Sequence, residues 1–217
     1  MALDVHIDPA ETGLVVIDMQ NGFCHPQGAR GRAFGADSMA APQAIVPTCI
    51  ELIRVCRAAG MAVWFTRQVH YGDDRLRKQR RIPSHLDRRG LKLELCTRGT
   101  WNSELVDEIA AEMRPEDELV LKHRASAFYN TTFESELRMK GIQILICAGT
   151  TSSFCVESTI RDAYARDYDI IVPSDCIADT DDEAQASVLK NVTRFFGTVT
   201  TLAELTENLG VRHATGV

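Results

Sequence analysis

Short apolar runs rich in β-branched residues recur along the chain, and each is bounded by polar or turn-forming residues. Runs of this length are too short for helices, so they predict strands that are buried on both faces of a sheet. The six predicted strands are residues 13–19, 61–66, 118–122, 142–149, 169–172 and 198–201.

The stretches between these runs show helical spacing. In residues 39–59, apolar side chains such as Leu52 and Cys56 recur at three- or four-residue intervals, which predicts an amphipathic helix. Pro47 lies inside this pattern, so it either kinks the helix or marks its true start. N-cap candidates followed by acidic residues, together with a final apolar pattern, predict further helices at 103–113, 180–196 and 202–210.

The alternation of strands and helices predicts a Rossmann-like α/β fold, a three-layer α/β/α sandwich with a six-stranded parallel sheet. A chain of 217 residues suits one such domain over residues 1–217. In parallel sheets, functional residues gather at the carboxyl ends of the strands. Asp18 lies at the end of the first predicted strand, Lys122 ends the third, and Cys155 follows the fourth.

Each of these three residues has an ordinary structural explanation. Asp18 suits a turn, Lys122 can extend its ammonium group to solvent, and Cys155 can be a small packing residue. Together, a thiol, a carboxylate and an ammonium group supply a nucleophile, a base and an electrostatic stabiliser. If a helix begins near Ser152 or Ser153, its N-terminus lowers the pKa of the Cys155 thiol, and its backbone N–H groups can bind an oxyanion.

The composition excludes several classes of function. Hydrophobic residues make up 45% of the chain and charged residues 25%, as in ordinary soluble globular proteins. The net charge of −6 argues against a nucleic-acid partner. No apolar run approaches the roughly 20 residues of a membrane span, and the first residues lack the pattern of a secretory signal. We therefore expect a cytoplasmic protein without a membrane partner.

Seven cysteines are present, which is an odd number, and none of them forms a Cys-x-x-Cys pair. A disulfide framework or a cysteine-ligated zinc site is therefore not expected. This use of cysteine is typical of a reducing compartment.

One long connection, residues 67–100, differs from the rest of the chain by its positive charge. A connection of this length is usually a lid, a binding loop or an interface. The segment is expected to act either as a solvated or subunit-facing surface or as a lid whose arginines hold an anionic substrate. Its basic residues are Arg75, Arg77, Lys78, Arg80, Arg81, Arg88, Arg89 and Lys92.

Four stretches resemble one known family. They are VVIDMQNGF (15–23), LVLKHRASAFYNT (119–131), AGTTSSFCVESTIRDA (148–163) and VPSDCIAD (172–179). In this order they resemble the isochorismatase-like cysteine hydrolases, the superfamily of nicotinamidases and N-carbamoyl amidohydrolases. The resemblance implies that Asp18, Lys122 and Cys155 are the catalytic residues. It also implies a cis peptide bond between Thr150 and Thr151, and an oxyanion hole formed by the N–H groups of Thr151 and Cys155.

The resemblance is nearest to the ureidoacrylate and other N-carbamoyl amidohydrolases. It implies cleavage of a C–N bond in a small amide, ureido or N-carbamoyl substrate through an acyl-enzyme, with release of ammonia or an amine. It implies no cofactor, and it implies a homodimer or homotetramer. The implied pocket residues are Gln20, Phe23, His70, Trp101, Ser126, Phe128, Tyr129 and Asn130.

Several alternatives remain open. Nicotinamidases of this superfamily hold zinc with an Asp-x-His pair after the second strand, whereas this chain has His70 and Asp73 without that pair, so no metal is expected. A nicotinamidase-like or isochorismatase-like hydrolase is the first alternative, although Cys155 favours cleavage of a C–N bond. A non-catalytic ligand-binding member of the fold is the second. A nucleotide-binding Rossmann protein would need a Gly-rich turn, which DMQNGFCHPQG does not supply.

Overall fold

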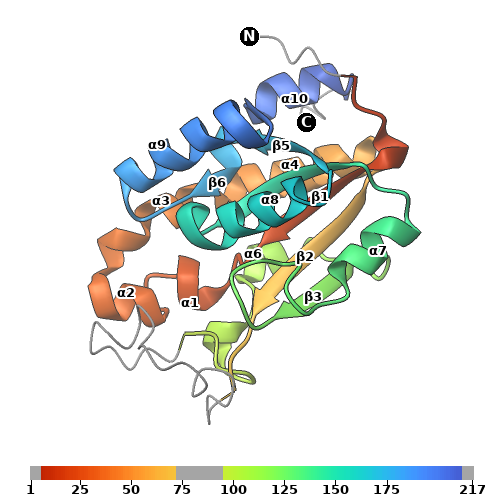
Figure 1. Ribbon diagram of the computed structural model, residues 1–217. Coiled ribbons are helices and arrows are strands. Elements are labelled where there is room, and N and C mark those ends of the chain that lie inside the picture. Colours follow the sequence, from red (N-terminus) through yellow and green to blue (C-terminus); the bar gives the residue numbers. More distant parts are fainter. Residues whose placement is uncertain (1–5, 72–94, 212–217) are drawn as a thin grey trace, which may run out of the picture.

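A parallel sheet carries the fold in the computed structural model, which describes residues 6–71 and 95–211 (Figure 1). The strands lie in the order β3-β2-β1-β4-β5-β7, and the short β6 pairs with β4. They are β1 (Thr12–Ile17), β2 (Ala62–Gln68), β3 (Glu118–Lys122), β4 (Ile144–Thr150), β5 (Asp169–Pro173), β6 (Ile177–Ala178) and β7 (Thr198–Thr200).

All six predicted strands are confirmed, and β6 is an addition that the sequence pattern did not predict. Strand β4 pairs with β5 only as far as Ile146. Beyond that point β5 diverges, and β6 pairs with Gly149 and Thr150 instead. The carboxyl end of β4 therefore stays hydrogen-bonded up to the residues that precede Cys155.

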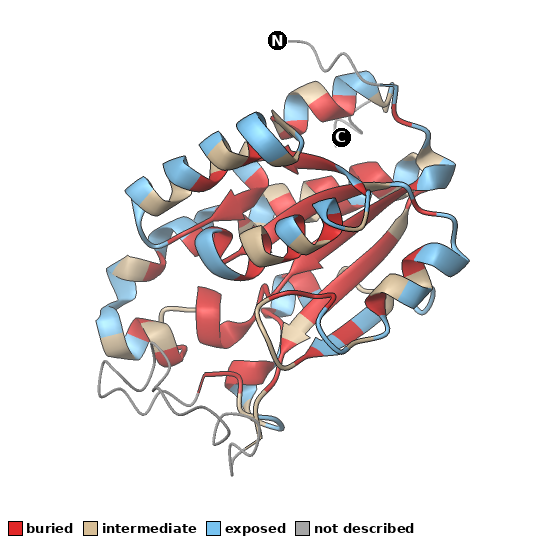
Figure 2. Ribbon diagram, viewed as in Figure 1, coloured by how far each residue is buried: buried red, intermediate tan, exposed pale blue. Residues whose placement is uncertain are grey.

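Helices cover both faces of the sheet, so the predicted three-layer α/β/α sandwich is confirmed. In β1, Leu14 and Val16 pack toward one face, while Val15 and Ile17 pack toward the other. This two-sided burial explains the continuous apolar runs of the central strands. Strand β1 is buried along its whole length, whereas the edge strand β3 exposes Leu119 and Leu121 (Figure 2). The first face is covered by α4 (Val46–Ala58), α6 (Asp107–Ala110) and α10 (Leu202–Asn208), and the second by α7 (Phe133–Met139), α8 (Glu157–Tyr164) and α9 (Asp182–Asn191).

The helical pattern of residues 39–59 is divided in the structure. It forms α3 (Ala40–Ala44) and α4, and Pro47 lies in the first turn of α4, where its missing N–H costs no helical hydrogen bond. Taken together, Ala36–Ala58 is long and apolar enough to span a membrane by length and composition, contrary to the expectation from the sequence. In this fold its apolar side chains, such as Leu52, pack on the sheet.

The predicted helix at 103–113 is wrong over most of its length, because only α6 is α-helical there. Ser103 ends a short 3-10 turn, Trp101–Ser103, and Glu104 and Val106 are extended, so this part contacts other segments instead of continuing a helix. The carbonyl of Ser103 accepts hydrogen bonds from the side chains of Gln20 and Arg67, and Leu105 forms an antiparallel bridge with Gln20. These tertiary contacts outweigh the local helical pattern and tie this segment to the end of β1.

All seven cysteines are buried free thiols. Burial raises the pKa of five of them above the ordinary value of 9.0, that of Cys147 to about 12. The other four thiols shifted by burial are those of Cys24, Cys56, Cys96 and Cys155.

Because of these buried thiols, we expect the free energy of unfolding to fall at alkaline pH. Above pH 9 the unfolded chain releases thiol protons that the native state retains, so the unfolded state binds fewer protons and the free energy of unfolding falls with pH. Each such thiol contributes about 1.4 kcal/mol per pH unit. Urea unfolding between pH 8 and 10 measures this slope, and Cys147→Ala should reduce it. A free energy of unfolding that stays constant over this range would contradict the prediction.

Candidate active site

Asp18 follows β1 directly, and its backbone has a positive φ of 51°. The side chain is completely buried, and Oδ1 accepts a hydrogen bond of 2.7 Å from the Thr66 hydroxyl of β2. On its other side, β4 lies close to β1 because Gly149 has a φ of 114°, and a Cβ there would lie 2.1 Å from the Ile17 carbonyl oxygen. Glycine at this point therefore lets the ends of the central strands approach each other.

Lys122 ends β3 and does not extend to solvent. Its side chain is completely buried, and Nζ lies 2.6 Å from Oδ2 of Asp18. Nζ also donates to the carbonyl oxygens of Arg124 and Ala125, at 3.1 and 2.9 Å. Burial alone would lower the pKa of this ammonium group, but the interactions with Asp18 and Cys155 together outweigh it, and the net pKa is raised. Lys122 therefore stays charged beside Asp18.

Cys155 lies in a turn of π-helix, Ser152–Val156, that leads into α8. Only 2% of the residue is exposed, and Sγ lies 3.3 Å from Oε1 of Gln68. Burial raises the pKa of the thiol, the Lys122 charge opposes this rise, and Asp18 adds to it by its charge and by a hydrogen bond. The net direction is opposite to the lowering expected from a helix N-terminus alone. Cys155 is therefore a protonated thiol at rest, and a nucleophilic role for it would require a base.

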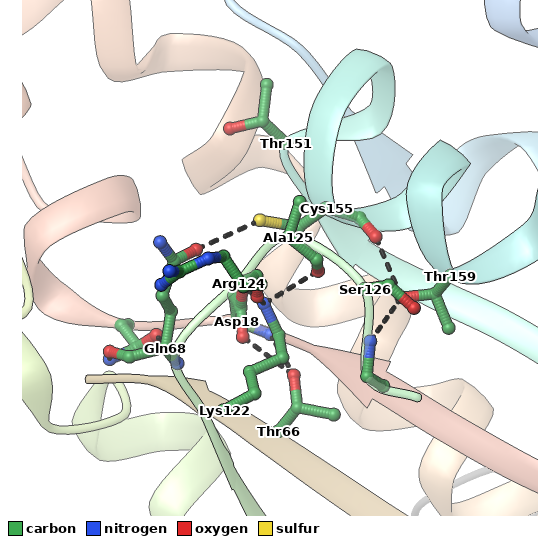
Figure 3. A network of polar contacts seen from close by, with 12 residues as sticks. Asp18, Thr66, Gln68, Lys122, Arg124, Ala125, Ser126, Thr151, Cys155 and Thr159 are labelled. Atoms are coloured by element: carbon green, nitrogen blue, oxygen red, sulfur yellow. Dashed lines mark hydrogen bonds and ion pairs between the residues drawn. The ribbon is translucent and has the colours of Figure 1, made fainter. Parts of the chain in front are cut away.

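The peptide bond between Thr150 and Thr151 is cis in the structure, at the position implied by the family resemblance. The Thr151 carbonyl accepts hydrogen bonds from the N–H groups of Phe154 and Val156, which closes the turn around Cys155. The Thr151 hydroxyl accepts a hydrogen bond of 2.8 Å from Arg30 and points away from Asp18 and Lys122 (Figure 3). The side chain of Thr151 therefore contacts Arg30, and its carbonyl helps to hold the turn around Cys155.

Gln68, at the carboxyl end of β2, is the polar neighbour of Cys155 that the sequence analysis missed (Figure 3). The predicted second strand stopped at residue 66, so Gln68 was assigned to the long connection. With β2 extended to its observed end, the strand-end rule that selected Asp18 and Lys122 selects Gln68 as well.

Two of the predicted pocket residues, Gln20 and His70, are brought close to Gln68. Gln20 is completely buried, and its amide bonds the backbone N–H and carbonyl of Gln68 and the carbonyl of Ser103. The Nε2 atom of His70 lies 3.0 Å from Nε2 of Gln68. Gln20 therefore fixes the backbone of Gln68, and His70 contacts its side chain.

The remaining predicted pocket residues are spread over several environments. Phe23 is buried in α1 (Asn21–Cys24), and Trp101 is 45% exposed and stacks edge-on against His25. Phe128 packs in the core of the second face, edge-on against Phe133. The other three lie on the loop after β3: Ser126 is buried and accepts a hydrogen bond from the Phe128 N–H, Tyr129 is exposed, and Asn130 is exposed with a positive φ.

The basic part of the 67–100 segment, from Arg75 to Lys92, and Asp73 lie outside the described residues. Within residues 6–71 and 95–211, no group of three or more histidine, cysteine, aspartate or glutamate side chains is arranged to hold a metal ion. The structure therefore offers no metal-binding constellation in the described part of the chain.

Comparisons with known proteins show similarity along most of the chain. The model of the isochorismatase domain matches residues 12–204. Ureidoacrylate amidohydrolase RutB of Methylobacterium radiotolerans is 32% identical over 223 residues, which cover 95% of this chain and 83% of that protein. The crystal structure of a cysteine hydrolase from Pseudomonas syringae pv. phaseolicola 1448A has a TM-score of 0.82, is 27% identical, and the match covers 97% of both chains.

N-carbamoylsarcosine amidase from Thermoplasma acidophilum is similar in fold and sequence. It has a TM-score of 0.69 and is 29% identical, and the match covers 88% of this chain and 96% of that chain. The family match over most of the chain confirms the resemblance drawn from the four sequence motifs. The chain belongs to the isochorismatase domain family.

Proposed function

We propose that this protein is a cysteine-dependent amidohydrolase that cleaves a C–N bond in a small amide, ureido or N-carbamoyl substrate. The observation that carries the proposal is the buried contact of Asp18 with Lys122 at 2.6 Å, beside a buried Cys155 thiol whose pKa responds to both charges. A base, a cation and a thiol that share one buried space have the composition required for nucleophilic acyl transfer.

The first half of the reaction forms an acyl-enzyme. Asp18 takes the proton from Sγ of Cys155, and the positive charge of Lys122 stabilises the thiolate. The thiolate attacks the carbonyl carbon, and in this proposal the N–H groups of Thr151 and Cys155 bind the resulting oxyanion. Asp18 then gives its proton to the leaving nitrogen, the C–N bond breaks, and ammonia or an amine departs.

The second half releases the acyl group. A water molecule gives a proton to Asp18 as its oxygen attacks the thioester carbonyl, and the C–S bond then breaks. The sulfur leaves as a thiolate and recovers its proton from Asp18, which restores the starting state. Asp18 thus acts as base and acid in turn, and Lys122 keeps its charge throughout.

The names of the relatives favour a ureido or N-carbamoyl compound over a simple amide. Ureidoacrylate amidohydrolase and N-carbamoylsarcosine amidase are both named for substrates with a carbonyl group between two nitrogens. Nicotinamidases are similar in fold, but the one from Bacillus subtilis is only 24% identical to this chain, so a nicotinamidase-like activity is the weaker alternative.

Release of ammonia from a panel of substrates tests the proposal. The panel contains ureidoacrylate, N-carbamoyl amino acids, biuret, nicotinamide and simple aliphatic amides. We expect turnover of at least one ureido compound and a covalent adduct on Cys155 in rapidly quenched samples analysed by mass spectrometry. Turnover without any adduct, and with full activity in Cys155→Ala, would exclude the covalent route. If nicotinamide were the one compound of the panel that released ammonia, the nicotinamidase-like alternative would be favoured.

A further inference from the structure

Gln68 contacts the reacting sulfur directly, but the mechanism above gives it no role. Its Oε1 accepts the hydrogen bond from the Cys155 thiol at 3.3 Å, and the residue is 8% exposed. At the other end of the same amide, Nε2 lies 3.0 Å from Nε2 of His70. The amide therefore spans the gap between the thiol and an imidazole.

The backbone of Gln68 is fixed independently of this side chain. Its N–H donates to Oε1 of Gln20 at 2.8 Å, and its carbonyl accepts from Nε2 of Gln20 at 3.0 Å. In the sheet, Gln68 pairs with Lys122 of β3. A substitution of the Gln68 side chain therefore changes the contact with sulfur while the strand keeps its hydrogen bonds.

We propose that Gln68 is a catalytic residue that holds the Cys155 thiol through Oε1, then turns its amide to donate an N–H to the thiolate, and that His70 positions this amide. The inference rests on the proposed function, because it adds a residue to the same reaction. Its chemical basis is that an amide presents an acceptor at one end and donors at the other.

The two states follow from the hydrogen bonds available at each end. While sulfur carries its proton, it donates to Oε1. The other end of the amide then donates to Nε2 of His70 in the tautomer whose hydrogen is on Nδ1. Once Asp18 has taken the thiol proton, the sulfur can only accept, and Oε1 would face a negative charge. About half a turn of the amide brings an N–H to the sulfur and Oε1 to His70.

The turned state requires a hydrogen on Nε2 of His70, which neutral imidazole supplies by moving its hydrogen from Nδ1 to Nε2 through solvent. No net proton is gained or lost in this exchange. Among the described residues, Asp18 and Lys122 are the charged groups that shift the pKa of this thiol. Since Lys122 bonds Asp18 and two carbonyls, the amide supplies a donor that approaches the sulfur from the side of β2.

Alkylation of Cys155 by iodoacetamide, followed by peptide mass spectrometry across pH, tests the role of Gln68 without a substrate. In Gln68→Met, which keeps the chain length and removes the donor and the acceptor, we expect alkylation at pH 8 to slow about tenfold to hundredfold. The apparent pKa of the thiol should rise, and kcat/KM should fall by a similar factor. Gln68→Glu should slow alkylation at least as much, and the exposed control Gln43→Met should leave it unchanged.

His70 is tested by a double-mutant cycle. His70→Phe should slow alkylation about threefold to tenfold in the wild-type background and have no effect in Gln68→Met, because its role passes through the amide. Equal effects in both backgrounds, or wild-type alkylation in Gln68→Met, would overturn the proposal. Slowed alkylation in a protein that hydrolyses no amide would instead refute the proposed function and leave the role of Gln68 intact.

Discussion

Replacement of Cys155 by alanine is expected to lower kcat/KM by about 10⁴-fold or more, because no other group can form the acyl-enzyme. Cys155→Ser should be nearly as inactive, since a hydroxyl loses its proton far less readily than a thiol. The initial rate of ammonia release measures both effects. The loss must come from chemistry, because the variants remove only one buried sulfur atom and leave the surrounding turn intact.

Cys147 provides a matched control for this prediction. Its thiol lies in β4, is fully buried in the core of the same face, and has a pKa raised to about 12 by burial. Cys147→Ala should lower the free energy of unfolding by about 1 kcal/mol and leave kcat/KM within about twofold of the wild type. If Cys155→Ala and Cys147→Ala had the same activity, Cys155 would be one more packing cysteine.

Replacement of Lys122 by methionine is expected to abolish activity and also to lower the free energy of unfolding by about 3–5 kcal/mol. Methionine keeps the length of the side chain but leaves the carboxylate of Asp18 buried without its cation. Urea unfolding at pH 7.5 measures the stability. Arg138, whose ion pair with Glu134 lies on the surface, is the control, and Arg138→Met should leave stability nearly unchanged.

The double variant Asp18→Asn with Lys122→Met separates stability from catalysis. The double variant has neither the buried carboxylate nor the buried ammonium group, so no charge is left unpaired and much of the lost stability should return. Activity should stay absent, because the base and the cation are both gone. Recovery of activity together with stability would show that the pair only supports the fold, and the proposed mechanism would be wrong.

The central strands could be predicted from the sequence because they are buried on both faces. Strand β1 is buried at every position, so no surface requirement disturbs its apolar run. The prediction of a helix at 103–113 was wrong for the opposite reason. Its residues suit a helix locally, but the carbonyl of Ser103 is needed by Gln20, and no local pattern reveals a partner more than 80 residues away.

The site was only partly visible in the sequence. The strand-end rule identified Asp18 and Lys122, and the structure places both in contact. Gln68 was missed because the apolar run ends at Thr66, although the ladder with β3 continues to residue 68. The direction in which the pKa of the Cys155 thiol shifts could not be predicted either. It depends on burial and on Asp18, and neither is a property of the local sequence.

A parallel β-bridge joins His70 to Thr97. His70 donates its N–H to the Cys96 carbonyl, and Arg98 donates its N–H to the carbonyl of His70, so the two ends of residues 71–95 are joined to each other. A longer or shorter stretch between such joined ends adds little entropic cost. We therefore expect a change in the length of this stretch to leave Gln68 and Lys122 in their positions.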